Sequence, residues 1–104
     1  MDELMRAISK YPNGTYMKIE WDSALLALGG VIETIYQTDN GMPETASMYR
    51  EYYAAAFRIK HILKNGSGQT YSSNMAMEVS MLTAPSRVFL ENDTLIWEAE
   101  TQAS

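Results

Sequence analysis

Four turn signals divide this chain at nearly even intervals and constrain its fold more than any other feature. In each, an asparagine precedes glycine or aspartate: Asn13-Gly14, Asn40-Gly41, Asn65-Gly66 and Asn92-Asp93, with successive asparagines 27, 25 and 27 residues apart. Asparagine tolerates positive φ and glycine adopts it without steric cost, so each pair suits a tight turn. The segments between them share no residue pattern, which argues against an internal repeat. The chain is therefore predicted to consist of strands that return on themselves.

Alternating polarity marks the predicted strands. In the segment 15–21, Met17, Ile19 and Trp21 share an apolar face and polar residues lie between them, as in a half-buried strand. Before it, Leu4 and Ile8 recur at helical spacing. The predicted elements are a helix at 2–11, strands at about 15–21, 24–38, 52–63, 75–82, 87–91 and 94–98, and loops at 39–48 and 65–74. The last two strands form a hairpin across the two-residue loop Asn92-Asp93.

Two of these segments carry a competing interpretation. Residues 49–64 could form a helix with an aromatic stripe, because the three alanines at 54–56 favour helix. As a strand, the segment places Phe57, Ile59, His61 and Leu63 on one face, and we prefer this reading because it agrees with the neighbouring strands. A short helical turn is the alternative for residues 24–28.

A pair of glycines interrupts the long strand at 24–38. Gly29-Gly30 predicts a bend, a bulge or a close approach of another backbone, which curls a short sheet toward a barrel. The predicted fold class is mainly β (α+β): an N-terminal helix followed by a five- to six-stranded antiparallel, strongly bent sheet or small barrel, in a single domain spanning 1–104. Four methionines are expected to pack its interior: Met17, Met75, Met77 and Met81.

Charge and cysteine content exclude several classes of function. The net charge is −5 with a pI of about 4.7, so the chain offers no basic face to phosphates and nucleic acid is a poor match as partner. There is no cysteine for disulfides or thiolate metal sites. No cationic leader and no run of roughly 20 apolar residues is present, so we expect a cytoplasmic protein that spans no membrane.

Catalytic chemistry finds little support among the side chains. His61 is the only histidine, and on an alternating strand such a residue is far more often structural than a general base. Gly66-Ser67-Gly68 lacks the lysine and serine or threonine that complete a phosphate-binding loop. The chain is therefore predicted to have no enzymatic activity, no cofactor and no bound metal.

Methionine and tyrosine are unusually frequent, with eight and seven copies. Methionine adapts to irregular surfaces and tyrosine is enriched in the cores of interfaces. Five such residues flank the loop at 39–48 and are predicted to form a contact patch: Met42, Met48, Tyr49, Tyr52 and Tyr53. The leading hypothesis is a small non-enzymatic interaction module that binds another protein or a second copy of itself.

An alternative hypothesis uses the acidic residues instead. A negatively charged decoy, of the kind that mobile genetic elements carry, would bind the basic groove of a nucleic-acid-binding enzyme and inhibit it. The residues expected to provide that surface are Glu20, Asp22, Glu33, Asp39 and Glu44. Steep weakening of binding with ionic strength would distinguish this decoy from a hydrophobic module.

The order of elements in the first forty residues resembles the Sm-like proteins, a family of small SH3-like β-barrels. The similarity rests on a leading helix, a strand, a sharp turn and a long strand bent at glycine, with the segment 30–40 similar in outline to the first motif of that family. The resemblance implies a third hypothesis, an oligomer that binds RNA. In it, Asp39-Asn40 stands for the base-contacting pair, whereas 94–98 lacks the Arg-Gly pair of the second motif.

Overall fold

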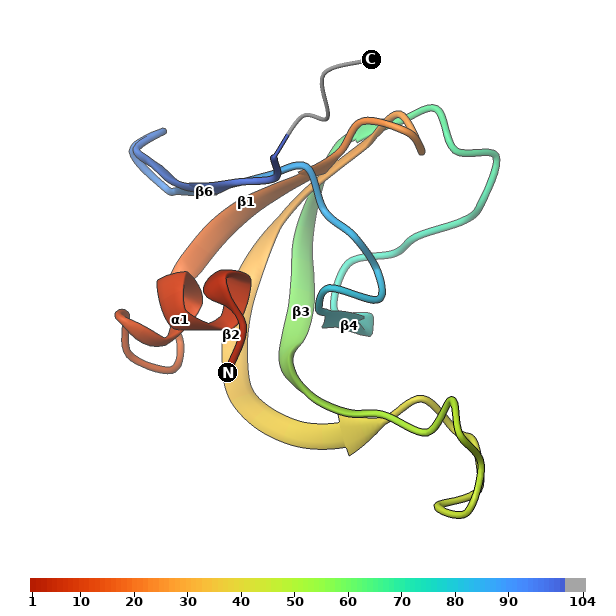
Figure 1. The fold of residues 1–104 in the computed structure, drawn as a ribbon. Helices are drawn as coiled ribbons and strands as arrows, with labels where there is room; N and C mark the ends of the chain where they lie inside the picture. The colour runs from red at the N-terminus through yellow and green to blue at the C-terminus, as the bar shows by residue number, and fades with distance from the viewer. Residues whose placement is uncertain (101–104) are drawn as a thin grey trace.

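A curved sheet and one short helix make up the protein, in a computed structural model that describes residues 1–100. The elements of this part of the chain are α1 (Glu3–Ser9), β1 (Tyr16–Trp21), β2 (Leu26–Asp39), β3 (Glu51–Asn65), β4 (Ala76–Val79), β5 (Arg87–Leu90) and β6 (Leu95–Glu98) (Figure 1). The prediction of a mainly β fold with an N-terminal helix is confirmed. The ambiguous segment is a strand, β3.

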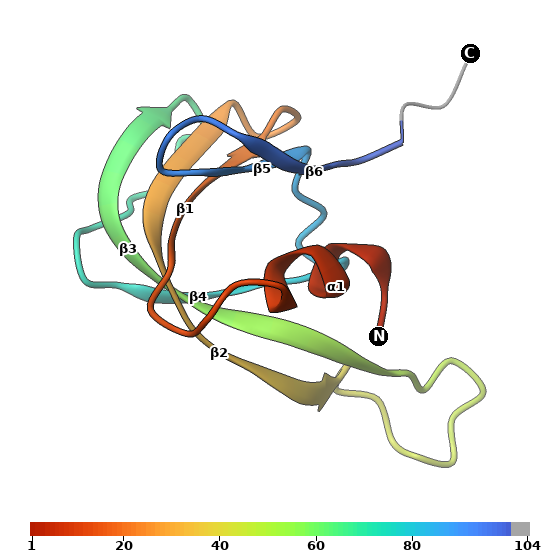
Figure 2. The ribbon, with the colours of Figure 1, turned by 90° about the vertical axis from the view of Figure 1, so that its left-hand side faces the viewer.

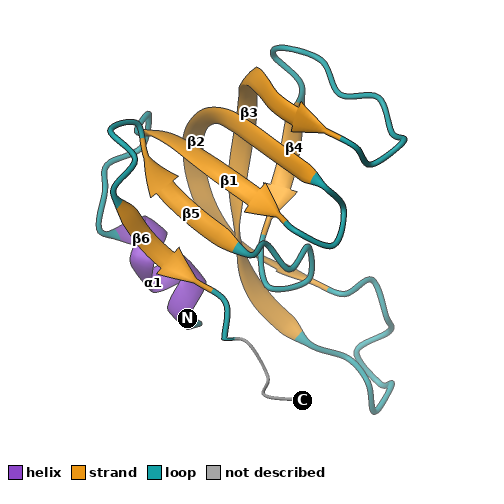
Figure 3. Cartoon of the chain, turned by 90° about the horizontal axis from the view of Figure 1, so that it is seen from above, coloured by secondary structure: helices purple, strands orange, loops and turns teal. Residues whose placement is uncertain are grey.

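The strands form one antiparallel sheet in the order β4-β3-β2-β1-β5-β6. The sheet curves strongly (Figure 2), but within residues 1–100 no pairing joins β4 to β6, so it is a bent sheet and not a closed barrel. α1 lies in the opening of the curve, where it contacts β6 and β3 (Figures 2 and 3). The helix thus covers the side that strand pairing leaves open.

Burial of apolar side chains holds this helix in place. A seven-residue helix is not stable alone in water, but Leu4, Met5 and Ile8 of α1 are at most 1% exposed. Their burial contributes about 5 to 9 kcal/mol before the entropy cost of ordering is subtracted. The strands supply the remainder of the core from their concave faces: Met17, Ile19, Trp21, Leu26, Leu28, Ile32, Ala55, Phe57, Ile59, Val79 and Val88.

The helix is shorter than the predicted range 2–11 because its two ends are capped inside that range. The Asp2 side chain accepts a hydrogen bond from the backbone N–H of Met5 at 2.9 Å, which makes Asp2 the N-cap. Lys10 is the C-cap. Pro12 then disfavours helical backbone at Tyr11, so the chain turns toward β1.

Turns also shorten two of the predicted strands. β2 begins at Leu26 and not at 24, because Leu25 has a φ of 52° and its N–H bonds to the carbonyl of Asp22. β4 covers 76–79 and not 75–82, because Ser80 starts a turn. The Ser80 N–H donates to Thr83 Oγ1 at 3.1 Å. The loop between β5 and β6 covers residues 91–94 and not two residues, since its Thr94 carbonyl accepts the N–H of Leu90.

The prediction that four methionines fill the interior is only partly correct. Met17 is fully buried and Met77 packs against the core from its edge, but Met75 and Met81 are 41% and 49% exposed. Met75 precedes β4 and Met81 lies in the turn after it, so neither follows the alternation of the strand. The apolar face predicted for β3 also ends early: Leu63 is exposed.

The two glycines in β2 allow two close contacts on opposite faces of the sheet. A Cβ at Gly30 would lie 2.1 Å from the carbonyl oxygen of Arg58 in β3, and one at Gly29 would lie 2.0 Å from the hydroxyl of Tyr16. The Tyr16 ring crosses the strand there, and its hydroxyl lies 2.9 Å from Nδ1 of His61. The pairing of β2 with β3 also shifts register between Gly29 and Gly30, so the predicted bulge is present.

These contacts predict that replacing either glycine by alanine lowers the free energy of unfolding, but by different amounts. Gly30→Ala forces a Cβ against backbone that cannot rotate away, and should lower the free energy of unfolding by about 3 kcal/mol. Gly29→Ala displaces a side chain and loses one exposed hydrogen bond, at about 1 kcal/mol. Urea unfolding of both variants measures the difference. Equal losses would contradict the assignment of Gly30 as the site where the two backbones lie too close for a side chain.

Candidate functional site

Three of the predicted acidic residues are neutralised by arginine. Arg87, in β5, lies with Nε 2.7 Å from Oε1 of Glu20, and its Nη2 bonds to Asp22. The hydrogen bond to Glu20, followed by that to Asp22, raises the pKa of Arg87. One guanidinium pairs with both carboxylates. Glu20 and Asp22 therefore link the end of β1 to β5, and little of their negative charge is left for a partner protein.

Glu33 is paired in a similar way on another part of the sheet. Arg58 Nε and Nη2 lie 3.0 and 3.1 Å from its two carboxylate oxygens, a bidentate arrangement. This hydrogen bonding is the main cause that lowers the pKa of Glu33. Glu33 lies at a register shift in the pairing of β2 with β3, and the ion pair bridges the two strands there.

The other two predicted acids lie on the long hairpin. Beyond its pairing with β4, the β2–β3 hairpin continues as an arm, defined here as residues 35–54, that extends away from the body (Figures 1 and 2). Asp39 and Glu44 are both exposed there, and Asp39 accepts the N–H of Gly41 at 2.8 Å. The five predicted acids therefore do not form one surface.

The predicted aromatic patch is also divided by the geometry of the arm. Met42 and Met48 are exposed at its tip, and the Tyr49 hydroxyl donates to Glu51 at 2.9 Å. Tyr52 and Tyr53 are neighbours in a strand and so point to opposite faces. Tyr53 packs against the core, whereas Tyr52 donates to Glu78 of β4.

The loop at the tip is organised by Asn40. Its side-chain amide donates to the carbonyl of Met48 at 2.8 Å, and its side-chain oxygen accepts the N–H of Met42 at 3.3 Å. In the segment that resembles the Sm-like motif, Asp39 and Asn40 thus both make hydrogen bonds within the loop. The RNA-binding hypothesis remains a prediction, to which these hydrogen bonds add nothing.

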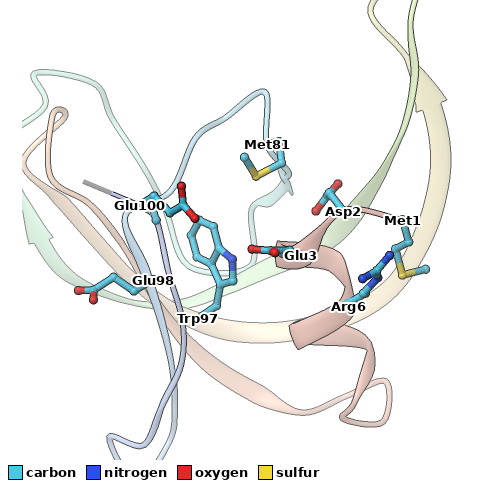
Figure 4. Close-up of a pocket in the computed structure, with 9 residues that line it drawn as sticks. Met1, Asp2, Glu3, Arg6, Met81, Trp97, Glu98 and Glu100 are labelled. Carbon is cyan, nitrogen blue, oxygen red and sulfur yellow. The ribbon is translucent and has the colours of Figure 1, made fainter. Parts of the chain in front are cut away.

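A groove that the sequence did not reveal lies at the open side of the sheet. It has a volume of about 650 Å³ and brings together the start of α1, the end of β6 and the turn after β4 (Figure 4). We call it the seam groove. Its lining residues are Met1, Asp2, Glu3, Arg6, Met81, Trp97, Glu98, Ala99 and Glu100.

The lining combines negative charge with an apolar wall. The lining side chains carry four carboxylates, those of Asp2, Glu3, Glu98 and Glu100, and one cation, Arg6. In Figure 4 the Trp97 indole lies between Glu98 and Glu100 on one side and Glu3 and Asp2 on the other, with Met81 above it. Trp97 packs against the core, which fixes its position.

Few of these carboxylates are neutralised from within the chain. The described ion pairs leave Asp2, Glu3 and Glu100 without a lysine or arginine partner within residues 1–100, and Glu98 lies 3.7 Å from Arg87. In the same part of the chain, no three acidic or histidine side chains are grouped closely enough to hold a metal ion. The groove is thus an acidic surface with an aromatic wall.

Sequence reasoning missed this groove because its residues come from three segments that lie far apart in the sequence. No local pattern in the sequence connects Asp2 and Glu3 with Glu98 and Glu100. The one available signal was general, since the chain ends of small domains are often close together.

Comparison with known proteins identifies one family. A family model described as "Cognate immunity protein YxxD" matches residues 1–101. No match was found among curated proteins or among solved structures. The helix of the described chain is too short and too polar to cross a membrane.

The pairing of Glu33 predicts a pH-dependent contribution to stability. Because the pKa of Glu33 is lowered from its ordinary value of 4.5, its ion pair stabilises the fold above about pH 4.5, and this contribution is lost as the pH falls through the lowered pKa. Glu33→Gln should therefore be less stable than the parent at pH 7, and the difference between the two proteins should shrink at an acidic pH well below 4.5. Urea unfolding at both pH values measures this.

The exposed Glu44 provides the control, since Glu44→Gln should match the parent at either pH. If Glu33→Gln lost nothing at pH 7, Glu33 would have no structural role and would again be a candidate contact residue.

Proposed function

Because the chain belongs to the YxxD cognate immunity protein family, we propose that it binds a cognate toxin protein and blocks the toxin's activity, with no catalysis of its own. The family match supports a protein partner, which both the interaction-module and the acidic-decoy hypotheses require. It favours the acidic inhibitor over the generic module, because an immunity protein acts on a harmful protein. The cytoplasmic location and the RNA-binding ring remain predictions.

The seam groove is the surface that we propose for toxin contact, and its unneutralised charge is the observation that carries this assignment. Glu20, Asp22 and Glu33 are held by arginines of the same chain. The carboxylates of Glu3 and Glu100 have no such partner within residues 1–100. A basic partner can neutralise them without first breaking an internal ion pair.

The lining defines the chemistry of the toxin surface. Carboxylates on both walls attract lysine and arginine side chains, and Trp97 offers an aromatic face against which a cation or an apolar side chain can pack. A toxin that acts on nucleic acid has such a basic surface, because it must neutralise phosphates. We therefore propose that the occupied surface of the toxin is its basic substrate-binding face.

The tip of the arm is a second candidate surface for the same toxin. Met42 and Met48 are 40% and 62% exposed, and the hydrogen bonds of Asn40 hold the loop in one conformation, which reduces the entropy lost on binding. Glu44 lies on the same loop. Self-association through this tip also remains a prediction, which light scattering tests.

Charge reversal in the groove should weaken toxin binding more than the same reversal elsewhere. Glu3→Lys and Glu100→Lys should each lower the affinity for the purified cognate toxin about tenfold, mostly through slower association, and should flatten the salt dependence. Surface plasmon resonance at several salt concentrations measures both effects. Cells that express the toxin should lose protection in parallel.

Two matched variants separate the candidate surfaces. Glu91→Lys changes the charge by the same amount at an exposed position outside the groove and should bind like the parent. Glu44→Lys places that change on the arm. If only Glu44→Lys weakened binding, the arm and not the seam groove would be the contact surface; if the parent failed to bind the toxin at all, the proposed function would be wrong.

A further inference from the structure

Glu78 of β4 is a half-buried carboxylate whose hydrogen bonds within residues 1–100 come from hydroxyl groups alone. Tyr52 O–H lies 3.2 and 3.1 Å from its two oxygens, and Ser80 Oγ donates to Oε2 at 2.6 Å. Ser80 is itself fully buried and accepts the N–H of Leu82, so its orientation is fixed. The carboxylate is thus preorganised in one position.

No lysine or arginine of the described chain forms an ion pair with Glu78. Within residues 1–100 the ion pairs of Lys18, Arg58 and Arg87 go to other carboxylates, and none reaches Glu78. Partial burial makes an unpaired carboxylate costly, which favours a cation supplied from outside. Hydroxyl donors occupy some of its lone pairs and leave others available.

Two tyrosines stand beside Glu78 above a floor of small residues. In the register of the arm, Tyr36 is opposite Ala54 and Thr38 is opposite Tyr52, so both tyrosines lie on the face that carries Ala54. Ala56, on the same face, is opposite Glu78. Tyr36 remains 37% exposed, and desolvation and then the charge of Glu78 raise its pKa.

We propose that Tyr36, Tyr52 and Glu78 form a binding site for an arginine side chain of the toxin. The planar guanidinium stacks on a tyrosine ring and makes two parallel hydrogen bonds to a carboxylate, which fits this arrangement better than the compact lysine ammonium does. The identity of the partner rests on the proposed function, but the chemistry of the site does not.

The position of this site connects it with the seam groove. Glu78 and Ser80 lie at one end of the turn after β4, and Met81, which lines the groove, follows at once. Met81 and Leu82, which follow Ser80 in the chain, are 49% and 61% exposed. A toxin surface that places basic side chains in this site and in the groove can cover these apolar residues in the same contact.

Titration with N-acetyl-arginine amide, followed by NMR, tests the site without the toxin. The probe should shift the ring signals of Tyr36 and Tyr52 and the methyl signals of Ala54 and Ala56. N-acetyl-citrulline amide, which has nearly the same shape and no charge, should not. Glu78→Gln and Tyr36→Ala should each remove the shifts, whereas Tyr36→Phe, which keeps the ring, should retain them.

Glu51 supplies the matched control, because it also accepts a tyrosine hydroxyl but is exposed. Shifts that survive Glu78→Gln, that Glu51→Gln reduces equally, or that citrulline reproduces would overturn the site. Against the purified toxin, Tyr36→Ala and Glu78→Gln should each lower the affinity at least tenfold. If the parent binds the arginine probe but both variants keep the parent's affinity for the toxin, the site does not bind the toxin. The proposed function would then still stand.

Discussion

The close approach of β3 to Gly30 of β2 is the contact on which the rest of the structure depends. No side chain fits between the two backbones there, and the register shift at this point accompanies the strong curvature of the sheet. Curvature brings β6 near the helix while β4 and β6 stay unpaired, which leaves an open side. The buried face of α1 fills that opening, and the seam groove lies where the helix, β6 and the turn after β4 meet. The groove is thus a consequence of a sheet that bends without closing.

Charge is distributed in two classes across the surface. Glu20, Asp22 and Glu33 are tied to Arg87 and Arg58, where they join strands β1 to β5 and β2 to β3. The carboxylates of the seam groove and Glu78 lack such partners within residues 1–100, apart from the 3.7 Å contact of Glu98. Exposed ion pairs contribute little to stability, so the first class matters mainly for holding particular side chains still. Apart from Glu98, the carboxylates of the second class have no ion-pair partner within residues 1–100 to cancel their electric field, and this field speeds the association with a basic surface.

Local patterns in the sequence predicted the elements well, because the cause of each element is itself local. Alternation identified β1, agreement with the neighbouring strands favoured a strand for β3, and Gly29-Gly30 indicated the bulge in β2. Failures arose where a side-chain hydrogen bond or a contact between distant residues decided the outcome. Met75 and Met81 have the spacing of a buried strand face, yet the Ser80–Thr83 hydrogen bond ends the strand between them. Grouping of the acids failed for the same reason, since no sequence rule joins Arg87 to Glu20 or Glu98 to Asp2. The candidate site is a tertiary feature, and the sequence indicated only the acidic character of the chain, not which acids gather there.

The surface that results suits an inhibitor that must bind fast and bind one partner. Acidic groups alone would attract many basic proteins, because long-range attraction does not discriminate among them. In this protein, side chains in fixed positions accompany the charges. Trp97 is fixed by the core, and Glu78 is oriented by Tyr52 and Ser80. A partner gains from these groups only when its cations are placed to match, and a mismatched partner leaves a half-buried carboxylate unpaired. Unpaired carboxylates therefore attract a basic partner, and the fixed positions of Trp97 and Glu78 select among the partners that arrive.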